Sequence, residues 1–375
     1  MKKILLIDNR SQYFIGNRYH LAKALTAKSL DVHVTTLSAN EEDIDIIEKI
    51  GITYHRLPSG KTTLGALKNV WHIHRLVQQI KPNIIHAFTL RAGVITSLAT
   101  NSGSKQPLII SITGLGYTFT SHQKKATLLR TFVKLILRRF MVSRVNVWVF
   151  QNTDDMDFFA AEIGVSRQTS IFIPGSGVDT NQFSYEPEPL NTATVVFIGR
   201  LLRDKGVGEY IEAAQHINQK AHRAMFILVG DIDPDNPSSF SARDINGWVN
   251  AGIIKHIGYQ KNIAQIIHKA NIICLPSYRE GLPKILLEAG ATGRAVVATD
   301  VPGCREVVEN GVNGLLVPRG DSASLSQAIL KLLEKPELRL KMGKAGRKRV
   351  ESQFSVGSIV EQFMLVYQER TRLIK

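Results

Sequence analysis

Short apolar runs alternate with longer amphipathic stretches along nearly the whole sequence, and this alternation limits the fold more than any other feature. The stretch Ala66–Gln79 places Leu67, Val70, Ile73 and Val77 on one face of an expected helix. Alternating strands and helices are typical of right-handed βαβ units around a buried parallel sheet. The strands expected in the first half are Lys3–Ile7, Val32–Thr36, Thr53–Arg56, Asn83–His86, Leu108–Thr113 and Val145–Phe150.

The alternation stops over residues 174–191, which are rich in Pro, Gly and polar residues and are typical of a linker between domains. It then restarts with the runs Thr194–Ile198, Met225–Val229, Ile254–Ile257, Ile272–Leu275 and Ala295–Thr299. A chain of 375 residues also suits two domains better than one. We therefore predict an α/β protein with two Rossmann-like domains, at residues 1–180 and 192–355. Ligands bind beyond the carboxyl ends of such sheets, so two crevices facing each other across a cleft would suit a two-substrate transfer.

The composition describes a basic chain that has no disulfide framework. The formal net charge is +15, and a field of that sign attracts phosphates, nucleic acid or anionic lipid. The only cysteines are Cys274 and Cys304, which favours a reducing cytoplasm. The apolar start of the chain is interrupted by Asp8 and Asn9, and no long uncharged apolar stretch follows that would span a bilayer. We expect a cytoplasmic protein.

Two glycines and two cations follow the first strand of the second domain. The loop Gly199–Gly206 contains Arg200 and Lys205, and a helix is expected directly after it. Glycines allow close backbone approach, and cations at the carboxyl edge of a sheet can bind a diphosphate and stabilise it as it departs. A surface loop with solvated charges is the alternative.

The segment after strand Ile272–Leu275 carries two glutamates around a helix start. Pro283 suits the first turn of that helix, and the backbone amides near Gly281 and Leu282 would then point at phosphate oxygens. Glu280 precedes the helix, whereas Glu288 lies inside its apolar run and needs a partner. That partner is either a ribose diol or a neighbouring arginine. For Glu280 the alternative is an ordinary acid at a helix N-terminus.

Glu280 and Glu288 form an E-x7-E element, and the segments around it resemble the retaining GT-B glycosyltransferases of family four over essentially the whole chain. The matching segments are GRLLRDKG (199–206), LVGD (228–231) and LPSYREGLPKILLEAGATGRAVVATDVPGCREVVENGVNGLLVP (275–318). Three further segments, residues 86–99, 111–121 and 233–258, resemble a narrower group. These are bacterial transferases that assemble capsule and O-antigen repeat units on a polyprenyl diphosphate.

The resemblance implies a transfer from a UDP-sugar to a polyprenyl-diphosphate-linked saccharide. The sugar would be a hexose or an N-acetylhexosamine, 6-deoxy forms included, and no cofactor or metal is expected. Asp231 and Asp233 have the Asp-x-Asp form, but they match a loop of the family's second domain. A C-terminal helix at 356–375 would return to the first domain. The catalytic residues would be Glu280, Arg200 and Lys205, and the donor-binding residues Gly199, Arg200, Lys205, Gly281, Leu282 and Glu288.

The first domain would bind the acceptor, with contacts expected at Gly16, Arg91, Thr113 and Gly114. Many relatives carry His-Gly where this chain has Thr113 and Gly114. Threonine can form hydrogen bonds but cannot act as a base near neutral pH. We therefore expect a front-face displacement assisted by the leaving phosphate, which requires charge stabilisation and orientation. Further candidate contacts to an acceptor diphosphate are Arg10, Arg18 and His86, for which ordinary surface roles are the alternative.

Residues 122–144 read as a basic amphipathic helix, a pattern typical of an anionic membrane interface. A core-packing helix with a cationic outer face is the alternative. The membrane contacts would be Lys124, Lys125, Lys134, Arg138 and Arg139. The enzyme would then lie on the inner face of the cytoplasmic membrane.

Two other functions compete with glycosyl transfer. The first is a sugar-nucleotide epimerase of the same architecture, which needs no acceptor. The second is a non-enzymatic nucleic-acid binder that uses the net charge. The basic residues are not interleaved with aromatic residues in a recognition motif, so we expect no nucleic-acid partner. No G-x-G-x-x-G follows the first strand, which argues against a dinucleotide oxidoreductase.

Overall fold

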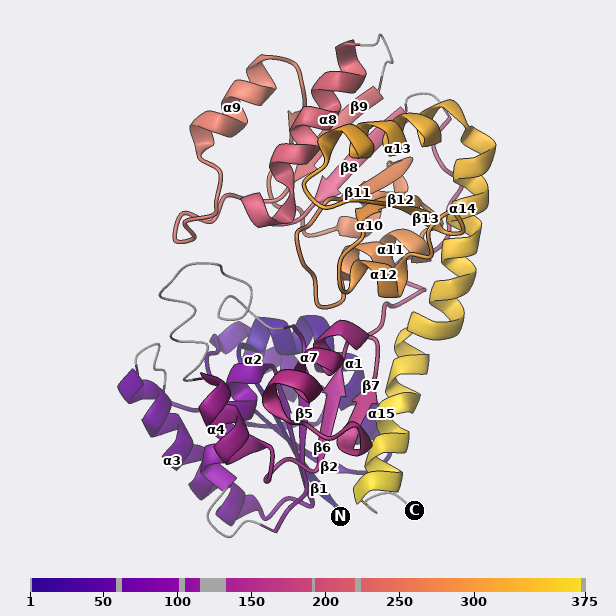
Figure 1. Cartoon of the computed structure of the whole chain (residues 1–375). Helices are drawn as coiled ribbons and strands as arrows, with labels where there is room; N and C mark the ends of the chain where they lie inside the picture. Colours follow the sequence, from indigo (N-terminus) through magenta and orange to yellow (C-terminus); the bar gives the residue numbers. More distant parts are fainter. Residues whose placement is uncertain are drawn as a thin grey trace. The chain divides into compact units, whose positions relative to one another are not determined.

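The computed structural model describes residues 2–58, 63–100, 105–114, 133–190, 193–219 and 224–371. The chain divides into two compact units (Figure 1). Unit 1 comprises Met1–Ser176 and Val356–Lys375, and unit 2 comprises Gly177–Ser355. Each unit contains one parallel sheet with helices on both faces, which confirms the expected α/β class.

Unit 1 has a seven-stranded sheet in the order β3-β2-β1-β4-β5-β6-β7. The strands are β1 (Lys3–Asp8), β2 (Asp31–Thr36), β3 (Thr53–His55), β4 (Ile84–Phe88), β5 (Leu108–Ile112), β6 (Val147–Phe150) and β7 (Ser170–Phe172). Strand β1 pairs in parallel with β2 on one side and with β4 on the other. The strand order therefore reverses at β1, and a crevice for ligands is expected beyond the carboxyl ends of β1 and β4.

Helices cover both faces of this sheet. One core lies under α1 (Ser11–Ala27), α2 (Glu41–Glu48) and α15 (Val356–Thr371). The other lies under α3 (Thr63–Ile80), α4 (Leu90–Thr100), the π-helical turn η1 (Leu137–Met141) and α7 (Thr153–Ile163), which a short 3₁₀ turn (Arg167–Thr169) follows. The central strands β1, β4, β5 and β6 are buried on both faces, which explains their nearly continuous apolar sequences.

The C-terminal helix α15 belongs to unit 1, as expected. Phe363 and Tyr367 are buried in its core, and the Tyr367 hydroxyl lies 2.7 Å from Nδ1 of His86. Nε2 of His86 lies 2.8 Å from the Ser111 hydroxyl. Burial holds the pKa of His86 well below its ordinary value, so the ring is neutral. His86 is fully buried and Arg18 nearly so, so neither is a surface contact for an acceptor.

Unit 2 has a six-stranded sheet in the order β10-β9-β8-β11-β12-β13. The strands are β8 (Ala193–Ile198), β9 (Ala224–Val229), β10 (Lys255–His256), β11 (Ile272–Leu275), β12 (Ala295–Thr299) and β13 (Gly314–Val317). The helical segments are η3 (Arg203–Lys205), α8 (Val207–Gln219), α9 (Ala242–Asn250), α10 (Ile263–His268), α11 (Lys284–Ala291), α12 (Cys304–Val307), α13 (Ser322–Glu334), α14 (Pro336–Arg349) and η4 (Val350–Phe354). Helix α11 begins at Lys284, so Pro283 is its N-cap and lies just outside the first turn.

The segment 177–190 is fastened to unit 2, although its composition is typical of a linker. Phe183 is buried in the unit 2 core. Arg294, 1% exposed, donates hydrogen bonds to the carbonyl oxygens of Glu186 and Pro187. Arg339 forms a two-pronged ion pair with Glu188, with N···O distances of 2.7 and 2.8 Å. Composition alone does not reveal such buried partners.

The buried Arg339–Glu188 pair provides a stability test. Arg339→Ala leaves a buried carboxylate without its partner, which costs about 3–5 kcal/mol of unfolding free energy. Arg305→Ala is the matched control, because its pair with Asp300 is exposed, at 42% and 55%, and such pairs contribute about 1 kcal/mol or less. Urea denaturation of both variants measures the difference. Equal midpoints would contradict the role given to the buried pair.

Candidate functional site

Two loops meet at the carboxyl edge of the unit 2 sheet. Strands β8 and β11 are neighbours, so the loops that follow them, 199–206 and 276–283, start side by side. Gly206 has a φ of +74°, and a Cβ there would lie 2.0 Å from the carbonyl oxygen of Pro276. The backbone N–H of Tyr278 also donates to the Asp204 carbonyl oxygen at 2.9 Å. Glycine is therefore required for the two loops to pack this closely.

The same packing brings Lys205 and Glu280 together. Nζ of Lys205 lies 2.5 Å from Oε1 of Glu280, and the two side chains are only 22% and 12% exposed. A glycine also supports Glu280 from behind: a Cβ at Gly303 would lie 2.5 Å from the Gly281 carbonyl oxygen and 2.8 Å from that of Glu280. A cation and a carboxylate are thus presented together on a rigid backbone.

Glu288 is a buried carboxylate whose charge is only weakly balanced by a neighbouring cation. It lies in α11 with its side chain 13% exposed, and Nζ of Lys284 is 4.0 Å from its Oε1. Burial raises the pKa of Glu288, and the Lys284 charge only partly opposes this shift. The cation beside it is thus a lysine and not the arginine considered as its partner. Hydroxyl groups of a ligand could donate to this carboxylate and offset its desolvation.

Arg200 lies on the outer side of the same edge. Its side chain is 62% exposed, and Nη1 is 3.6 Å from Oδ2 of Asp233. Oδ1 of Asp231 accepts a hydrogen bond from the backbone N–H of Tyr259 at 2.9 Å. Both acids of the Asp-x-Asp segment therefore have partners within unit 2. Within the described ranges, no group of three or more His, Cys, Asp or Glu side chains is placed to hold a metal ion.

The residues predicted to bind an acceptor follow three adjacent strands of unit 1. Gly16 lies in α1 after β1, Arg91 in α4 after β4, and Thr113 and Gly114 directly after β5. Gly16 and Arg91 are exposed, and Thr113 and Gly114 are half-buried. They share the carboxyl edge of the sheet, and the structure records no direct hydrogen bond among these four described residues.

The sequence of each unit matches a known family. Residues 178–349 match the family described as Glycosyl transferases group 1, and residues 3–147 match the family described as Glycosyl transferase 4-like. The chain belongs to the group 1 glycosyltransferases. The family resemblance expected from the E-x7-E element is thereby confirmed.

Curated relatives of this glycosyltransferase align over nearly their full length. The N,N'-diacetylbacillosaminyl-diphospho-undecaprenol alpha-1,3-N-acetylgalactosaminyltransferase of Campylobacter jejuni is 27% identical over 96% of this chain and 95% of its own. The capsular polysaccharide biosynthesis glycosyltransferase CapM of Staphylococcus aureus is 23% identical over 92% and 91%. The crystal structure of Anabaena HepE with UDP superposes with a TM-score of 0.79 at 20% identity, over 98% of this chain and 100% of HepE. The glycosyltransferase thus has the GT-B fold.

Sequence reasoning missed Tyr278, which orients the loop that carries Glu280. Its hydroxyl donates to Oε1 of Glu209 at 2.5 Å, and the Arg319 guanidinium lies 5.6 Å from its ring centroid. The hydrogen bond to Glu209 and partial burial raise the pKa of Tyr278 to about 12. Glu209 is far away in sequence, so no local pattern indicates this pair.

Two further residues at the carboxyl edge of unit 1 were also missed. Thr89 follows β4 with a φ of +80°, a strained conformation for a β-branched residue. Asp8 ends β1 and is 2% exposed, with Arg18 Nε 3.9 Å away and the Asn9 N–H donating at 2.6 Å. An acid at the end of an apolar run is a sequence signal for Asp8, whereas Thr89 has none.

The expected membrane helix is only partly described. Lys124 and Lys125 lie outside the described residues. Lys134 forms an ion pair with Glu162 of α7, and Arg138 donates to the Glu162 carbonyl oxygen at 2.8 Å. Arg139 lies 5.5 Å from the ring centroid of its neighbour, Phe140. Lys134 and Arg138 therefore contact α7. No helix among the described residues is long and apolar enough to cross a membrane.

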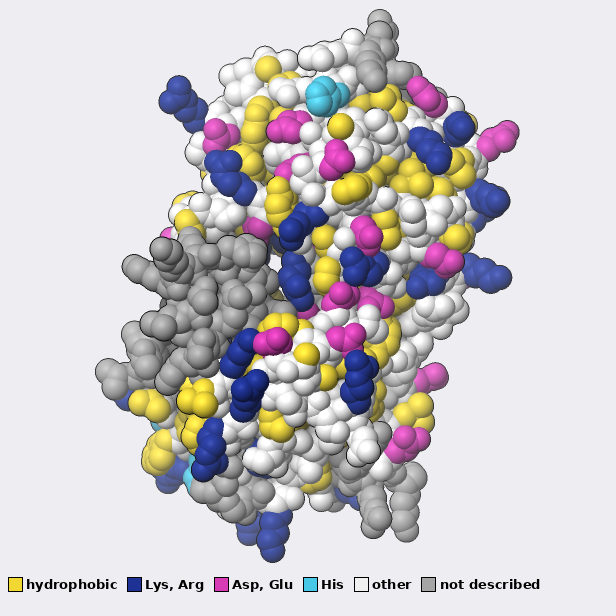
Figure 2. Space-filling model, viewed as in Figure 1, with side chains coloured by type: hydrophobic (Ala, Val, Ile, Leu, Met, Phe, Trp, Pro, Cys, Tyr) yellow, Lys and Arg dark blue, Asp and Glu magenta, His cyan; other side chains and the backbone are white. Residues whose placement is uncertain are grey.

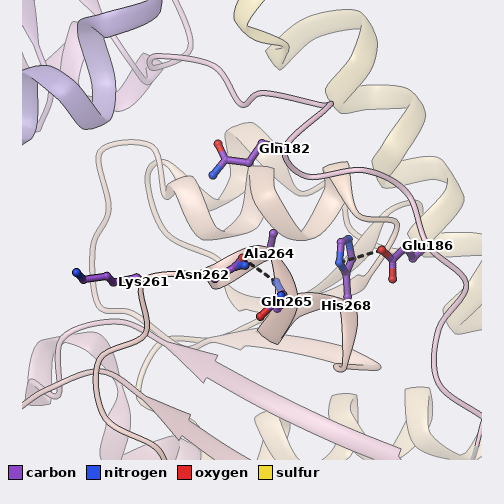
Figure 3. A pocket seen from close by; sticks show the side chains of 7 residues that line it. All are labelled: Gln182, Glu186, Lys261, Asn262, Ala264, Gln265 and His268. Atoms are coloured by element: carbon purple, nitrogen blue, oxygen red, sulfur yellow. Dashed lines mark hydrogen bonds and ion pairs between the residues drawn. The ribbon is translucent and has the colours of Figure 1, made fainter. Parts of the chain in front are cut away.

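A shallow hollow lies elsewhere on unit 2 (Figure 3). It has a volume of about 490 Å³ and is lined by Gln182, Glu186, Lys261, Asn262, Ala264, Gln265 and His268. His268 closes one end, with Nδ1 3.2 Å from Oε1 of Glu186 and Nε2 2.9 Å from the Ser184 carbonyl oxygen. None of the predicted site residues lines this hollow.

Asp8 provides a test of the electrostatics in unit 1. Burial raises its pKa from 3.8 to about 6, although Arg18 opposes the shift. Because the folded-state pKa is above the unfolded one, the contribution of Asp8 to stability is fully present below about pH 4 and is lost as pH rises through about 6. The shift corresponds to a loss on the order of 3 kcal/mol. Asp8→Asn removes this dependence. Urea denaturation across that pH range measures it, and an unchanged slope would refute the assignment.

Proposed function

We propose that this glycosyltransferase is a retaining enzyme that uses a UDP-sugar, a hexose or N-acetylhexosamine derivative, as donor. The acceptor is a polyprenyl-diphosphate-linked saccharide in surface polysaccharide biosynthesis. The observation that carries the proposal is the Lys205–Glu280 pair at the edge shared by β8 and β11. A cation for a diphosphate and a carboxylate for sugar hydroxyls lie side by side there.

The donor would occupy the carboxyl edge of unit 2. Lys205 holds Glu280 before donor arrives, and a bound diphosphate would share its charge. Arg200 is 62% exposed, so its guanidinium can turn from Asp233 toward a second phosphate oxygen. Glu288 would accept hydrogen bonds from the ribose hydroxyls, which replaces the solvation that burial removes. Gly281 and Leu282 lie just before Pro283, the N-cap of α11, and would offer backbone amides to the diphosphate or the sugar.

The transfer would be a front-face displacement. The bond from the anomeric carbon to the phosphate oxygen breaks, and a bond to the acceptor oxygen forms on the same face. The acceptor hydroxyl proton passes to the leaving phosphate, so no protein base is needed. Lys205 and Arg200 stabilise the charge that develops on the diphosphate. Thr113 stands where many relatives carry histidine, and its hydroxyl would orient the acceptor without removing a proton.

The proposal for the acceptor rests on relatives and on the unit 1 edge. The Campylobacter relative is named for an acceptor linked to diphospho-undecaprenol, and CapM is named for capsular polysaccharide biosynthesis. Gly16, Arg91, Thr113 and Gly114 would contact such an acceptor at the carboxyl ends of β1, β4 and β5. The enzyme would therefore work in the cytoplasm, at the inner face of the membrane that holds the lipid.

Ligand-induced stabilisation tests the donor site. UDP at about 100 times its Kd stabilises the folded enzyme by about 2.7 kcal/mol, because it binds only the folded state. Arg200→Ala and Lys205→Ala should each lose most of the resulting rise in Tm. Arg203→Ala is the control, since Arg203 lies in the same loop but stacks over Phe240 at 4.5 Å. If no nucleotide or nucleotide sugar changes the Tm, the donor-site assignment is wrong.

Glu280 and Glu288 should differ in what their substitution changes. Glu280→Gln should lower kcat by about a hundredfold and change donor Kd little, because its contact strengthens as charge develops on the sugar. Glu288→Ala should weaken donor binding by about tenfold or more, because a hydrogen bond to a charged group is lost. Steady-state kinetics and donor titration separate the two effects. Equal losses of both parameters in both variants would contradict these roles. EDTA should leave the rate nearly unchanged.

A further inference from the structure

The whole net charge of the chain lies in one stretch of sequence. Residues 49–153 contain no aspartate or glutamate, and they carry 15 lysines and arginines. The rest of the chain carries 32 basic and 32 acidic side chains, so its formal charge is zero. Basic residues distributed evenly along the chain would not give this result. The excess charge is therefore a property of one region.

That region includes three helical segments of one layer of unit 1. They are α3, α4 and η1, which pack on the same face of the sheet. The opposite face carries α2, whose first turn contains Glu41, Glu42 and Asp43. Helix α7 borders these segments at η1, where Arg138 donates to the Glu162 carbonyl oxygen. The charge is thus asymmetric: α3, α4 and η1 carry cations without any acid, and the acids lie beside and opposite them.

The outer side of α3 adds apolar side chains to this charge. Leu67 is 64% exposed, which corrects the expectation that it shares a face with Ile73 and Val77, which are buried. Trp71, one helical turn from Leu67, is 53% exposed. The Arg75 guanidinium lies 4.6 Å from the Trp71 ring centroid, and Lys68 is exposed beside them. Figure 2 shows hydrophobic side chains among Lys and Arg side chains in the region where Figure 1 draws α3. We call Leu67, Lys68, Trp71 and Arg75 the α3 face.

We propose that the α3 face binds the surface of an anionic lipid bilayer. Tryptophan favours the bilayer interface, where its ring is apolar and its N–H remains hydrated. Each lysine or arginine near an anionic surface contributes about 1 kcal/mol. The apolar side chains Leu67 and Trp71 lie beside the cations Lys68 and Arg75. This combination suits a bilayer, which offers acyl chains and anionic headgroups at one surface. Nucleic acid would call for several aromatic platforms along a groove.

The α3 face is a different membrane contact from the helix at residues 122–144 that the sequence indicated. In that segment Lys134 and Arg138 contact Glu162, so they are partly neutralised within unit 1. No acidic residue occurs anywhere in α3. The inference concerns a surface and would hold even if the acceptor were soluble in water, so it does not depend on the proposed reaction.

Vesicle binding of the full chain tests the proposal directly. The protein should sediment with phosphatidylcholine vesicles that contain phosphatidylglycerol, and salt should release it. The fluorescence of Trp71 reports on this surface, because Trp148 is buried and Trp248 belongs to unit 2. Its emission should shift to shorter wavelength with anionic vesicles, and Trp71→Phe should abolish the shift. Equal binding to phosphatidylcholine alone, or no binding, would overturn the proposal.

Paired variants separate the α3 face from net charge. Lys68→Glu with Arg75→Glu should weaken vesicle binding by about tenfold or more. Lys331→Glu with Lys341→Glu, two exposed positions of α13 and α14, changes the net charge equally and should have little effect. Leu67→Ser with Trp71→Ser should also weaken binding, whereas Leu365→Ser on α15, also 53% exposed, should not.

The results of these variants decide between the α3 face and a general effect of charge. Unchanged melting of each variant shows that its fold is intact. Equal loss in the α3 and control pairs would mean that total charge drives binding, and it would overturn the proposal. Binding of RNA at the same salt concentration without vesicle binding would overturn it as well. Loss of vesicle binding with unchanged donor stabilisation by UDP would support the surface independently of the donor site.

Discussion

The donor-site candidate depends on backbone contacts that only glycine permits. Gly206 packs against the Pro276 carbonyl, Gly230 against that of Gly199, and Gly303 against Gly281; added Cβ atoms would lie 2.0, 1.9 and 2.5 Å from these oxygens. These contacts join four loops at one edge of the unit 2 sheet. Since backbone rather than side-chain packing holds the loops, their spacing changes little. A side chain at any of these glycines would force one of these loops to shift.

Much of the architecture could be predicted, because strands buried on both faces of a parallel sheet are nearly continuous apolar runs. Strands β7 and β13, of three and four residues, were missed. Their length is not the reason, because β3 and β10 are no longer and were predicted. The glutamates of the E-x7-E element could be identified from their spacing. The pairing of Tyr278 with Glu209 could not, because the topology alone brings these residues together. His86 was misplaced because sequence does not reveal that Tyr367 covers it.

Some basic residues of this chain have a structural role that the net charge does not reveal. Arg294 and Arg339 are buried, and they fasten the segment 177–190 to unit 2 through carbonyl oxygens and Glu188. Their charges are compensated locally and contribute little to the field around the molecule. Composition suggested a loose linker there, since it reports Pro and Gly content but not the burial of an arginine far along the chain.

Charge balance has different consequences for the two units. Arg200 and Lys205 lie in a unit without a large excess of charge, so donor recognition depends on contacts within a few ångströms, where salt screens weakly at partly buried groups. The cations of the α3 face are exposed and uniform in sign, so their attraction to a surface extends over a Debye length of about 8 Å at physiological salt. Moderate salt would therefore release the protein from lipid while leaving the donor site occupied. A membrane contact of this kind is reversible, and it concentrates the enzyme at the surface without altering the geometry of the Lys205–Glu280 pair.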